Sequence, residues 1–487
     1  MAQEPIRPEL WELVKSTLAP AREAGRAYID SGRYVPKVEL LKYKENDQGW
    51  PQVVKSRILS NNDGPPDWTR LFSQKAGALS YVLIDTVPEL ARAIQQVVEL
   101  CKVDQTLGVG LSFLWQELDD KPERQNLYVE IGFRQIVENI LARAEALDIE
   151  DEDDLLDLYL QIERGRFSST LSGDVIVPLV LTDLEVTESV QLVDDLWLEQ
   201  LDEPMQRARA MDWQFPDQVS PWVAAAATHA IVKRNATFEN TAWPPNLRNG
   251  ERRPPVPLDD FDRFVECLQI VTGIKSGYAQ ILVRPRGWVE DGWQHDLPPL
   301  WQAQTLRAYP EDMNKHGWLR RKKPISSAEV GEAVTMLPRL QQSPKNVRLA
   351  ARRCRRTAFR HDLEDEIIDA TIGIEALLGK DRDELTHRMS QRAAVALTGE
   401  YPPNAVYTLL KQVYGQRSMI VHGKTPKNPT VKLGDHTFQA NHMAILLLRL
   451  LLRNYLLSEE PWTPDSLDEL ILKRMERPGG YGPADSD

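Results

Sequence analysis

The stretch 414–424, YGQRSMIVHGK, ends a pattern of apolar residues that recur at helical spacing. This pattern predicts an amphipathic helix over 404–422 with one buried face. Asn404 fits the N-cap, where its side chain can accept a backbone hydrogen bond, and Gly423 fits the first position beyond the C-cap, where left-handed backbone is common. The assignment of the C-terminal part of the chain depends on this helix.

Arg417 and His422 interrupt the apolar pattern near the end of this helix. Basic side chains in the last turns interact favourably with the helix dipole, so the pair has a purely structural explanation. It also has a chemical one, because arginine stays charged and binds phosphate through two N–H groups, whereas histidine transfers protons near neutral pH. The helix by itself leaves both explanations open.

Two further sequence blocks precede this helix, IEALLG at 374–379 and LTHRMSQRAA at 385–394. With RSMIVHG at 417–423 they form an ordered set that resembles the Apea-like branch of the HEPN family (higher eukaryotes and prokaryotes nucleotide-binding). The resemblance extends over about 348–457, which is less than a quarter of the chain.

The resemblance implies a ribonuclease site. In catalytic HEPN domains the Arg-x4–6-His motif cleaves RNA, and two helical bundles usually meet as a dimer. By position, the resemblance assigns the catalytic pair to Arg417 and His422. Many catalytic members have Asn, Asp or His where this chain has Ser418, so a third polar catalytic group is not carried over. The residues expected to support the site are Ser418, Tyr414, Glu375 and Lys424.

Cleavage of this kind needs no metal ion. The 2′-hydroxyl of RNA attacks the adjacent phosphate, so a base must take the hydroxyl proton and an acid must protonate the leaving 5′-oxygen. Histidine suits both proton transfers, and arginine suits the charge on the phosphorane. We therefore expect neither a metal ion nor a cofactor.

The expected function is that of a metal-independent endoribonuclease that serves as a toxin in antiphage or abortive-infection defence, a role that the resemblance implies. The large N-terminal region would be a sensor or regulator that holds the nuclease inactive until a phage-derived trigger arrives. One alternative is a non-catalytic HEPN scaffold that binds RNA or protein. Another is a toxin that a companion nucleotidyl-transfer enzyme neutralises.

The spacing within the motif favours a dimer. Arg417 and His422 are five residues apart, which is about 140° around an α-helix, so one helix does not easily aim both side chains at one phosphate. Two copies related by a two-fold axis can do so. We therefore expect a homodimer with a shared site, and such a contact would also explain apolar Ile420 and Val421 beside the charged residues.

A basic segment at 345–360 carries seven Lys and Arg residues and no Asp or Glu, on a chain whose net charge is −13. These side chains either pair with the acidic stretch 362–369 or line a groove that holds RNA phosphates. The sequence leaves both explanations open. The residues expected to contact RNA are Arg348, Arg352, Arg353, Arg355 and Arg356.

The overall charge, the cysteines and the lengths of the apolar segments argue against several other classes of protein. The charge of −13 over 487 residues argues against a protein that coats nucleic acid through its overall charge. Three widely separated cysteines form neither a disulfide framework nor a zinc site, and they suit a reducing cytoplasm. The N-terminus has no signal-peptide pattern, and the apolar segment 443–457 is too short and too charged to cross a membrane. The expected location is the cytoplasm, without membrane contact.

The expected fold class is α+β. A mixed α/β region over 1–326, with a subdomain boundary near 160, precedes a HEPN-like helical bundle over 327–460 and a mobile tail over 461–487. The bundle helices are expected at 345–360, 362–378, 383–398, 404–422 and 437–457. A strand inside any of the last four spans would contradict this assignment.

The N-terminal region mixes helical and strand-like patterns. Helices are expected at 9–28, 89–102, 129–147 and 259–274, and strands at 175–181, 186–197, 222–232 and 278–283. The segment 80–85 fits either a strand or the start of a helix. Pro178 suggests an edge strand or a break in the strand that contains it.

Two other features invite a functional explanation. The acidic run 145–157 fits a solvated helix start better than a metal site, because no calcium-loop pattern follows it. Four tryptophans lie among Pro, Gly and basic residues, either as anchors of an irregular connector or as a platform on which a base stacks. They are Trp288, Trp293, Trp301 and Trp318.

Overall fold

The computed structural model describes residues 4–55, 64–73, 81–111, 122–211, 218–240, 256–290, 292–293, 295–317, 323–380, 385–424 and 429–475. The chain divides into two compact units of three segments each. Unit 1 comprises Met1–Pro178, Asp195–Val256 and Gln280–Leu306, and unit 2 comprises Leu179–Asp194, Pro257–Ala279 and Arg307–Asp487. The chain thus enters unit 2 twice before residue 307, whereas the sequence suggested one boundary at 326/327.

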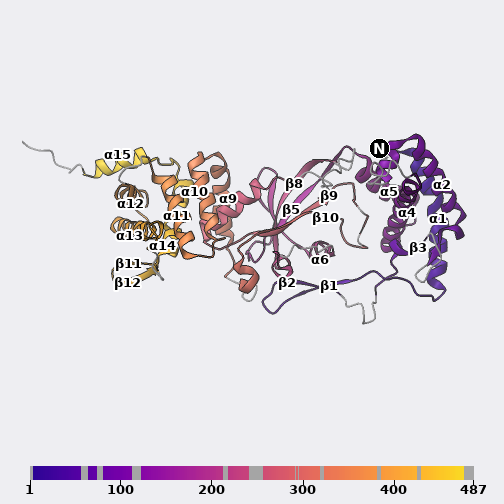
Figure 1. The fold of residues 1–487 in the computed structure, drawn as a ribbon, viewed down its shortest axis with the longest axis horizontal. Helices are drawn as coiled ribbons and strands as arrows, with labels where there is room; N and C mark the ends of the chain where they lie inside the picture. The colour runs from indigo at the N-terminus through magenta and orange to yellow at the C-terminus, as the bar shows by residue number, and fades with distance from the viewer. Residues whose placement is uncertain are drawn as a thin grey trace, which may run out of the picture. The chain divides into compact units, whose positions relative to one another are not determined.

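Unit 1 begins with a helical layer of α1 (Pro8–Asp30), α2 (Pro88–Val103), α3 (Gln105–Leu111), α4 (Pro122–Leu147) and α5 (Glu152–Phe167). Figure 1 shows α1, α2, α4 and α5 packed together, and their apolar faces form one core. In α2 the buried residues include Leu90, Val97 and Cys101, at the helical spacing that predicts this helix from the sequence. Between α1 and α2 lie β1 (Leu41–Glu45), β2 (Pro51–Lys55), η1 (Trp68–Arg70), β3 (Phe72–Ser73), β4 (Val82–Leu83) and η2 (Ile84–Thr86).

A sheet follows the helical layer. Its strands include, in spatial order, β10 (Trp301–Ala308), β9 (Tyr278–Pro285), β5 (Thr170–Pro178), β8 (His229–Glu239) and β7 (Leu196–Gln200). Strand β5 runs antiparallel to both β8 and β9, so it is a central strand, and Pro178 ends it rather than marking an edge. The short helices α6 (Glu203–Met211) and α7 (Pro221–Ala225) join β7 to β8.

Several N-terminal predictions need correction. The expected strand at 222–232 begins as α7 and turns into β8 only at His229, because Pro221 starts a helical turn. The expected strand at 186–197 is divided into β6 (Val190–Val193) and the beginning of β7. The helix expected at 129–147 begins seven residues earlier, at Pro122. The acidic run does start a helix, since the Asp151 side chain accepts a hydrogen bond from Asp153 N at the start of α5.

Unit 2 is mainly helical. Its helices are α8 (Asp259–Thr272), α9 (Ser327–Gln342), α10 (Lys345–Thr357), α11 (Leu363–Leu378), α12 (Leu385–Ala396), α13 (Pro403–Val421), α14 (Ala440–Leu457) and α15 (Pro464–Met475), with the short π-helical segment η5 (Met313–Gly317). The hairpin of β11 (Thr430–Leu433) and β12 (His436–Gln439) joins α13 to α14. Helix α8 packs on α9, α10 and α14. Unit 2 therefore includes a helix that precedes residue 327, where the sequence predicted the start of the helical bundle. None of the described helices is both long enough and apolar enough to cross a membrane.

The ends of these helices differ from the expected spans in two instructive places. Helix α13 starts at Pro403 with Pro402 as its N-cap, so Asn404 lies inside the helix and the predicted cap is wrong. Residues 437–439 belong to strand β12, so a strand occupies the first residues of the span expected for α14. By the criterion stated above, this strand contradicts the bundle as the sequence predicted it, with helix over the whole of 437–457.

The expected mobile tail is also partly wrong. Residues 464–475 form α15, which packs on α12. The Arg392 side chain is buried, and its Nη2 lies 2.6 Å from Asp468 Oδ2. Leu467, the residue before Asp468, is also buried. A buried apolar side chain and an ion pair therefore both attach α15 to unit 2. Residues 476–487 lie outside the described residues.

Candidate functional site

The motif helix α13 ends in a hydrogen-bonded C-cap. His422 is the C-cap residue, and Gly423 follows with a left-handed φ of +70°. Gly423 N donates to Ile420 O at 3.0 Å, and Lys424 N donates to Met419 O at 2.8 Å. These two bonds are those of a Schellman motif, which needs a residue that tolerates positive φ. The predicted role of Gly423 is thus confirmed, and the C-cap fixes the backbone at His422.

The motif arginine is paired inside its own unit. Arg417 Nη2 lies 3.1 Å from Glu375 Oε1 of α11, and both side chains are partly buried. Burial raises the pKa of Glu375, and the nearby Arg417 opposes this rise. The structure therefore brings Arg417 and Glu375 together, as expected for a supporting carboxylate.

Tyr414 lies one helical turn before Arg417 and is buried. Its hydroxyl donates to Met389 Sδ of α12 at 3.3 Å. Burial raises the pKa of Tyr414, and the nearby Glu375 raises it further. Tyr414 therefore packs as a neutral side chain that links α13 to α12, and its supporting role stays a prediction.

Most of the other motif residues face solvent, but Ile420 is buried in its own unit, so the expectation that it lies at a dimer contact is wrong and only Val421 of that pair is exposed. Ser418, His422 and Lys424 are exposed, and the apolar side chains beside them are exposed too: Met419 by 36% and Val421 by 61%. Among the described residues, none forms a hydrogen bond with the His422 ring. The end of α13 therefore presents a histidine with free ring nitrogens next to apolar surface.

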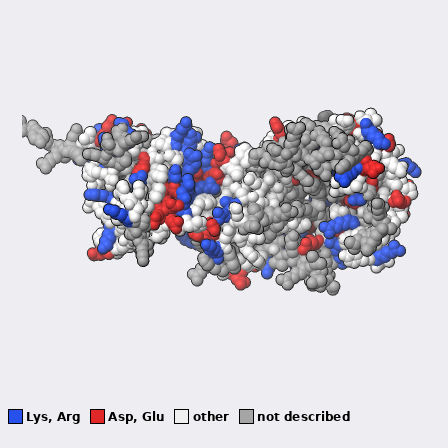
Figure 2. Space-filling view, viewed as in Figure 1, with Lys and Arg blue, Asp and Glu red and all other residues white. Residues whose placement is uncertain are grey.

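The basic helix α10 pairs mainly with acidic residues of its own unit. Asp369 of α11 is only 1% exposed and is surrounded by three arginines, with Arg353 Nη1 at 2.5 Å, Arg360 Nε at 2.6 Å and Arg356 Nε at 3.6 Å. In Figure 2, blue and red side chains lie next to each other where Figure 1 places α10 and α11. Pairing with the acidic stretch thus explains much of the basic run.

The remaining arginines of α10 divide into two kinds. Arg355 Nη1 lies 2.6 Å from Asp262 of α8, and the guanidinium also lies over the Tyr278 ring. Arg348 and Arg352 form no ion pair with a carboxylate among the described residues, and Arg352 is exposed. Contact with RNA stays a prediction for all five residues, and Arg352 and Arg356 are the exposed ones, although Arg356 Nε also lies 3.6 Å from Asp369.

Metal chemistry has no candidate in the described residues. They contain no group of three or more His, Cys, Asp or Glu side chains that could hold a metal ion. All three cysteines are buried, and burial raises the pKa of the Cys101 thiol to about 12. These thiols are therefore packing residues.

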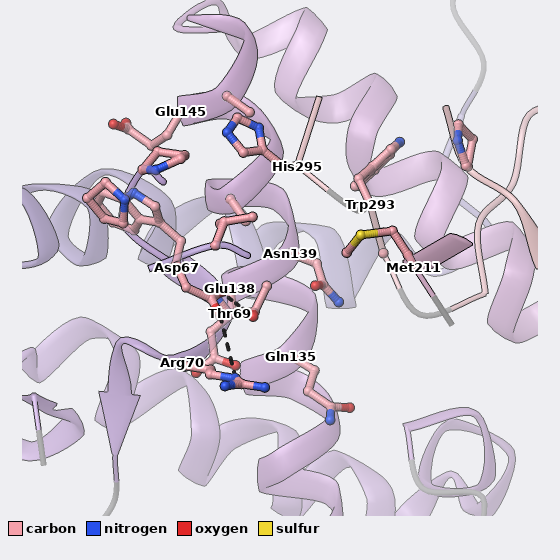
Figure 3. Close-up of a pocket in the computed structure, with 18 of the residues that line it drawn as sticks. Asp67, Thr69, Arg70, Gln135, Glu138, Asn139, Glu145, Met211, Trp293 and His295 are labelled. Atoms are coloured by element: carbon pink, nitrogen blue, oxygen red, sulfur yellow. Dashed lines mark hydrogen bonds and ion pairs between the residues drawn. The ribbon is translucent and has the colours of Figure 1, made fainter. Parts of the chain in front are cut away.

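A second site, in unit 1, escaped the sequence analysis. A cavity of about 1060 Å³ lies beside α4, and its lining includes Trp68, Trp293 and Trp301. Figure 3 shows Gln135, Glu138 and Asn139 projecting from α4 among the lining residues, with Trp293 and Met211 nearby. Trp293 and Trp301 belong to the predicted tryptophan set. Trp288 is instead a buried anchor whose Nε1 donates to Ser172 O at 2.6 Å, and Trp318 lies outside the described residues.

Comparison of the chain with protein-family models, with curated proteins and with solved structures finds no match.

Proposed function

We propose that unit 2 carries a HEPN-like, metal-independent endoribonuclease of the Apea-like branch, with Arg417 and His422 as its catalytic pair. The observation that supports this most is where the three sequence blocks lie. The blocks 374–379, 385–394 and 417–423 fall at the end of α11, on α12 and at the end of α13. These three helices pack against one another, so segments far apart in sequence form one compact group.

In the proposed reaction the 2′-oxygen forms a bond to the phosphorus as the bond from phosphorus to the 5′-oxygen breaks. One histidine takes the 2′-hydroxyl proton, and another gives a proton to the leaving 5′-oxygen. The exposed ring of His422 suits such transfers, because RNA can reach it from solvent. The Arg417 guanidinium stabilises the charge on the phosphorane oxygens.

The reaction as written needs two histidines, which supports a homodimer with a shared site. Met419 and Val421 expose apolar surface directly beside His422. An isologous contact through the end of α13 would cover this surface and bring two His422 rings to one groove. In this arrangement each subunit contributes one Arg417–His422 pair.

We propose that the nuclease is an antiphage or abortive-infection effector regulated by unit 1. This assignment rests on the sequence resemblance. Within unit 2, Arg348 and Arg352 are the proposed phosphate contacts, since Arg353, Arg355 and Arg356 already have carboxylate partners.

Incubation of the purified chain with single-stranded RNA in EDTA tests the proposal. Cleavage in EDTA, lost in Arg417→Ala and in His422→Ala, is the expected result. RNA binding without cleavage by the wild-type chain would overturn it and would favour the non-catalytic scaffold. Cleavage that EDTA abolishes would point to a metal-dependent nuclease elsewhere in the chain.

A further inference from the structure

The cavity in unit 1 has the size of a ligand site. Its volume is about 1060 Å³, near the upper end of the ~300–1,000 Å³ usual for small-molecule pockets. It is lined by α4, by η1 with the segment before it, and by residues between Pro285 and Gln302. All of these belong to unit 1, so the cavity is separate from the motif on α13.

One face of α4 is built for polar contact. Its lining positions are 135, 138, 139, 142, 145 and 146, which recur at i, i+3, i+4 and i+7 and so share one face of the helix. They carry Gln, Glu, Asn, Ala, Glu and Ala. The short alanine side chains leave room in the cavity. The opposite face of α4 packs into the core through Ile136, Val137, Ile140 and Leu141. A helix buried on one side therefore offers amides and carboxyls to the cavity on the other.

Glu138 is the most unusual member of this face. Its side chain is only 4% exposed, and its Oε1 lies 3.1 Å from Arg134 Nε. The geometry of this pair does not form a hydrogen bond, and neither atom has another partner among the described residues. A buried carboxyl oxygen without a hydrogen bond destabilises the fold. A ligand that hydrogen bonds to Glu138 would remove that cost.

The wall opposite α4 is held in place. Gly292 has a φ of +85°, and a Cβ on it would lie only 2.4 Å from Asn139 Cγ. Arg143 of α4 donates to His295 O at 2.5 Å and to Leu297 O at 3.1 Å, and its guanidinium lies 5.7 Å from the centre of the Trp293 ring. Gly292, Trp293 and the backbone of His295 and Leu297 are therefore held against α4, as expected for a preformed site.

These groups match the chemistry of a flat heteroaromatic ring. Indole surface stacks on such rings, and neighbouring carboxyl and amide groups hydrogen bond to their edges. We propose that the cavity binds a nucleobase, with Glu138, Gln135 and Asn139 contacting its hydrogen-bonding edge and the partly exposed Trp301 contacting its face. Trp68 and Trp293 are only 4% and 7% exposed and belong to the core behind the cavity wall. The base belongs either to a free nucleoside or nucleotide or to a strand of RNA.

Charge favours the base over the phosphate as the recognised part. Acidic side chains outnumber basic ones in the described lining, which includes the basic residues Arg26, Lys37, Arg70 and Arg166. Arg70 pairs with Asp67 at 3.5 Å, and Arg26 pairs with Glu145 at 2.9 Å. A phosphate in the cavity would therefore meet more acidic than basic side chains. A nucleoside should therefore bind at least as well as its 5′-monophosphate.

Calorimetric titration of the full chain tests this proposal. The probes are adenosine, guanosine, cytidine and uridine, their 5′-monophosphates, and a short single-stranded RNA of mixed sequence. We expect saturable binding of at least one nucleoside and a loss of about 10- to 100-fold in its affinity in Glu138→Gln. The exposed Glu123 begins the same helix, so Glu123→Gln is the matched control and should leave the affinity unchanged.

A second substitution tests the same proposal in case Glu138→Gln disturbs the fold. Ala142→Leu fills the cavity from α4 and should abolish nucleoside binding while thermal unfolding stays cooperative. Binding of RNA alone, weakened by both variants, would assign the site to a base within a strand. Absence of binding by every probe, or binding that both variants leave unchanged, would overturn the proposal. None of these readouts depends on RNA cleavage.

Discussion

Arg417 Nη2 lies 3.1 Å from Glu375 Oε1, so the arginine of the motif is held by a carboxylate of the neighbouring helix α11. A phosphate that binds Arg417 must compete with Glu375 for the same guanidinium. The pair is partly exposed, so water and salt weaken it, and the competition is modest in energy. Glu375 thus holds Arg417, and in the proposed nuclease this pair would limit the affinity of Arg417 for RNA phosphate.

Replacing Glu375 should reveal this competition. Glu375→Gln keeps the side-chain shape but removes the charge, so we expect RNA affinity to rise by up to about fivefold, since such partly exposed pairs contribute about 1 kcal/mol at most. Fluorescence anisotropy with labelled RNA measures it. Glu364→Gln, on the first turn of the same helix, is the control. An equal effect of both substitutions would argue against a specific competition.

The ion-pair cluster around Asp369 should be important for stability. Asp369→Asn leaves three arginines around a buried position without their carboxylate, and we expect a loss of about 2 kcal/mol or more in the free energy of unfolding. Asp365→Asn is the control, because Asp365 is half exposed and its one ion pair among the described residues is with Arg360. Urea unfolding compares the two variants, and equal losses would contradict a central role for Asp369.

The arginines of α10 should separate into two functional groups. Arg352→Ala should weaken RNA binding to all sequences alike and reduce the slope of log affinity against log salt by about 1, as expected for one lost phosphate contact. Arg353→Ala should instead lower stability, because it removes a partner of Asp369. Titrations at several salt concentrations measure the slope, and an unchanged slope in Arg352→Ala would exclude this contact.

Glu138 should make stability depend on pH. Burial raises its pKa from 4.5 to about 8, Asp67 adds to the rise and Arg134 opposes it. The folded chain therefore keeps a proton that the unfolded chain releases, so this stabilisation is full below about pH 4.5 and is lost as the pH rises towards 8. The loss is at most about 1.4 kcal/mol per pH unit in that window.

Glu138→Gln tests this pH dependence, because glutamine does not titrate. Urea unfolding should show a smaller loss of stability between about pH 5 and about pH 9 in this variant than in the wild-type chain. Part of the pH dependence should remain, since burial also raises the pKa of Glu266 in unit 2 to about 7. Identical pH profiles for variant and wild type would show that Glu138 is not buried as described.

Helical periodicity predicted most of unit 2 because its helices are amphipathic and long. The span expected for α11 differs from the structure by one residue, and Gly423 was identified because only a special backbone conformation favours glycine there. The strand at 437–439 was missed because β12 is a short exposed strand, and no burial imposes alternation on its sequence. The helix α15 was missed because its contacts, such as the pair Arg392–Asp468, join residues that are far apart in the sequence.

The two candidate sites were unequally visible in the sequence. Arg417 and His422 stand out as charged residues in an apolar pattern, whereas the pairing of Arg417 with Glu375 depends on how α11 and α13 pack. The sequence of α4 could have predicted the polar face around Glu138, because polar and small residues recur there at helical spacing opposite an apolar face. Its importance depends on a cavity formed by segments more than a hundred residues apart, which periodicity does not predict.

Analysis of RNA product ends in EDTA is the most direct test of the central claim, that His422 drives a metal-free transesterification. We predict that the wild-type chain leaves 2′,3′-cyclic phosphate and 5′-hydroxyl ends, that His422→Ala lowers the rate by about 10²-fold or more, and that His436→Ala, at an exposed histidine of β12, cleaves like the wild type. Cleavage by His422→Ala at the wild-type rate, or intact RNA with the wild-type chain, would contradict the account.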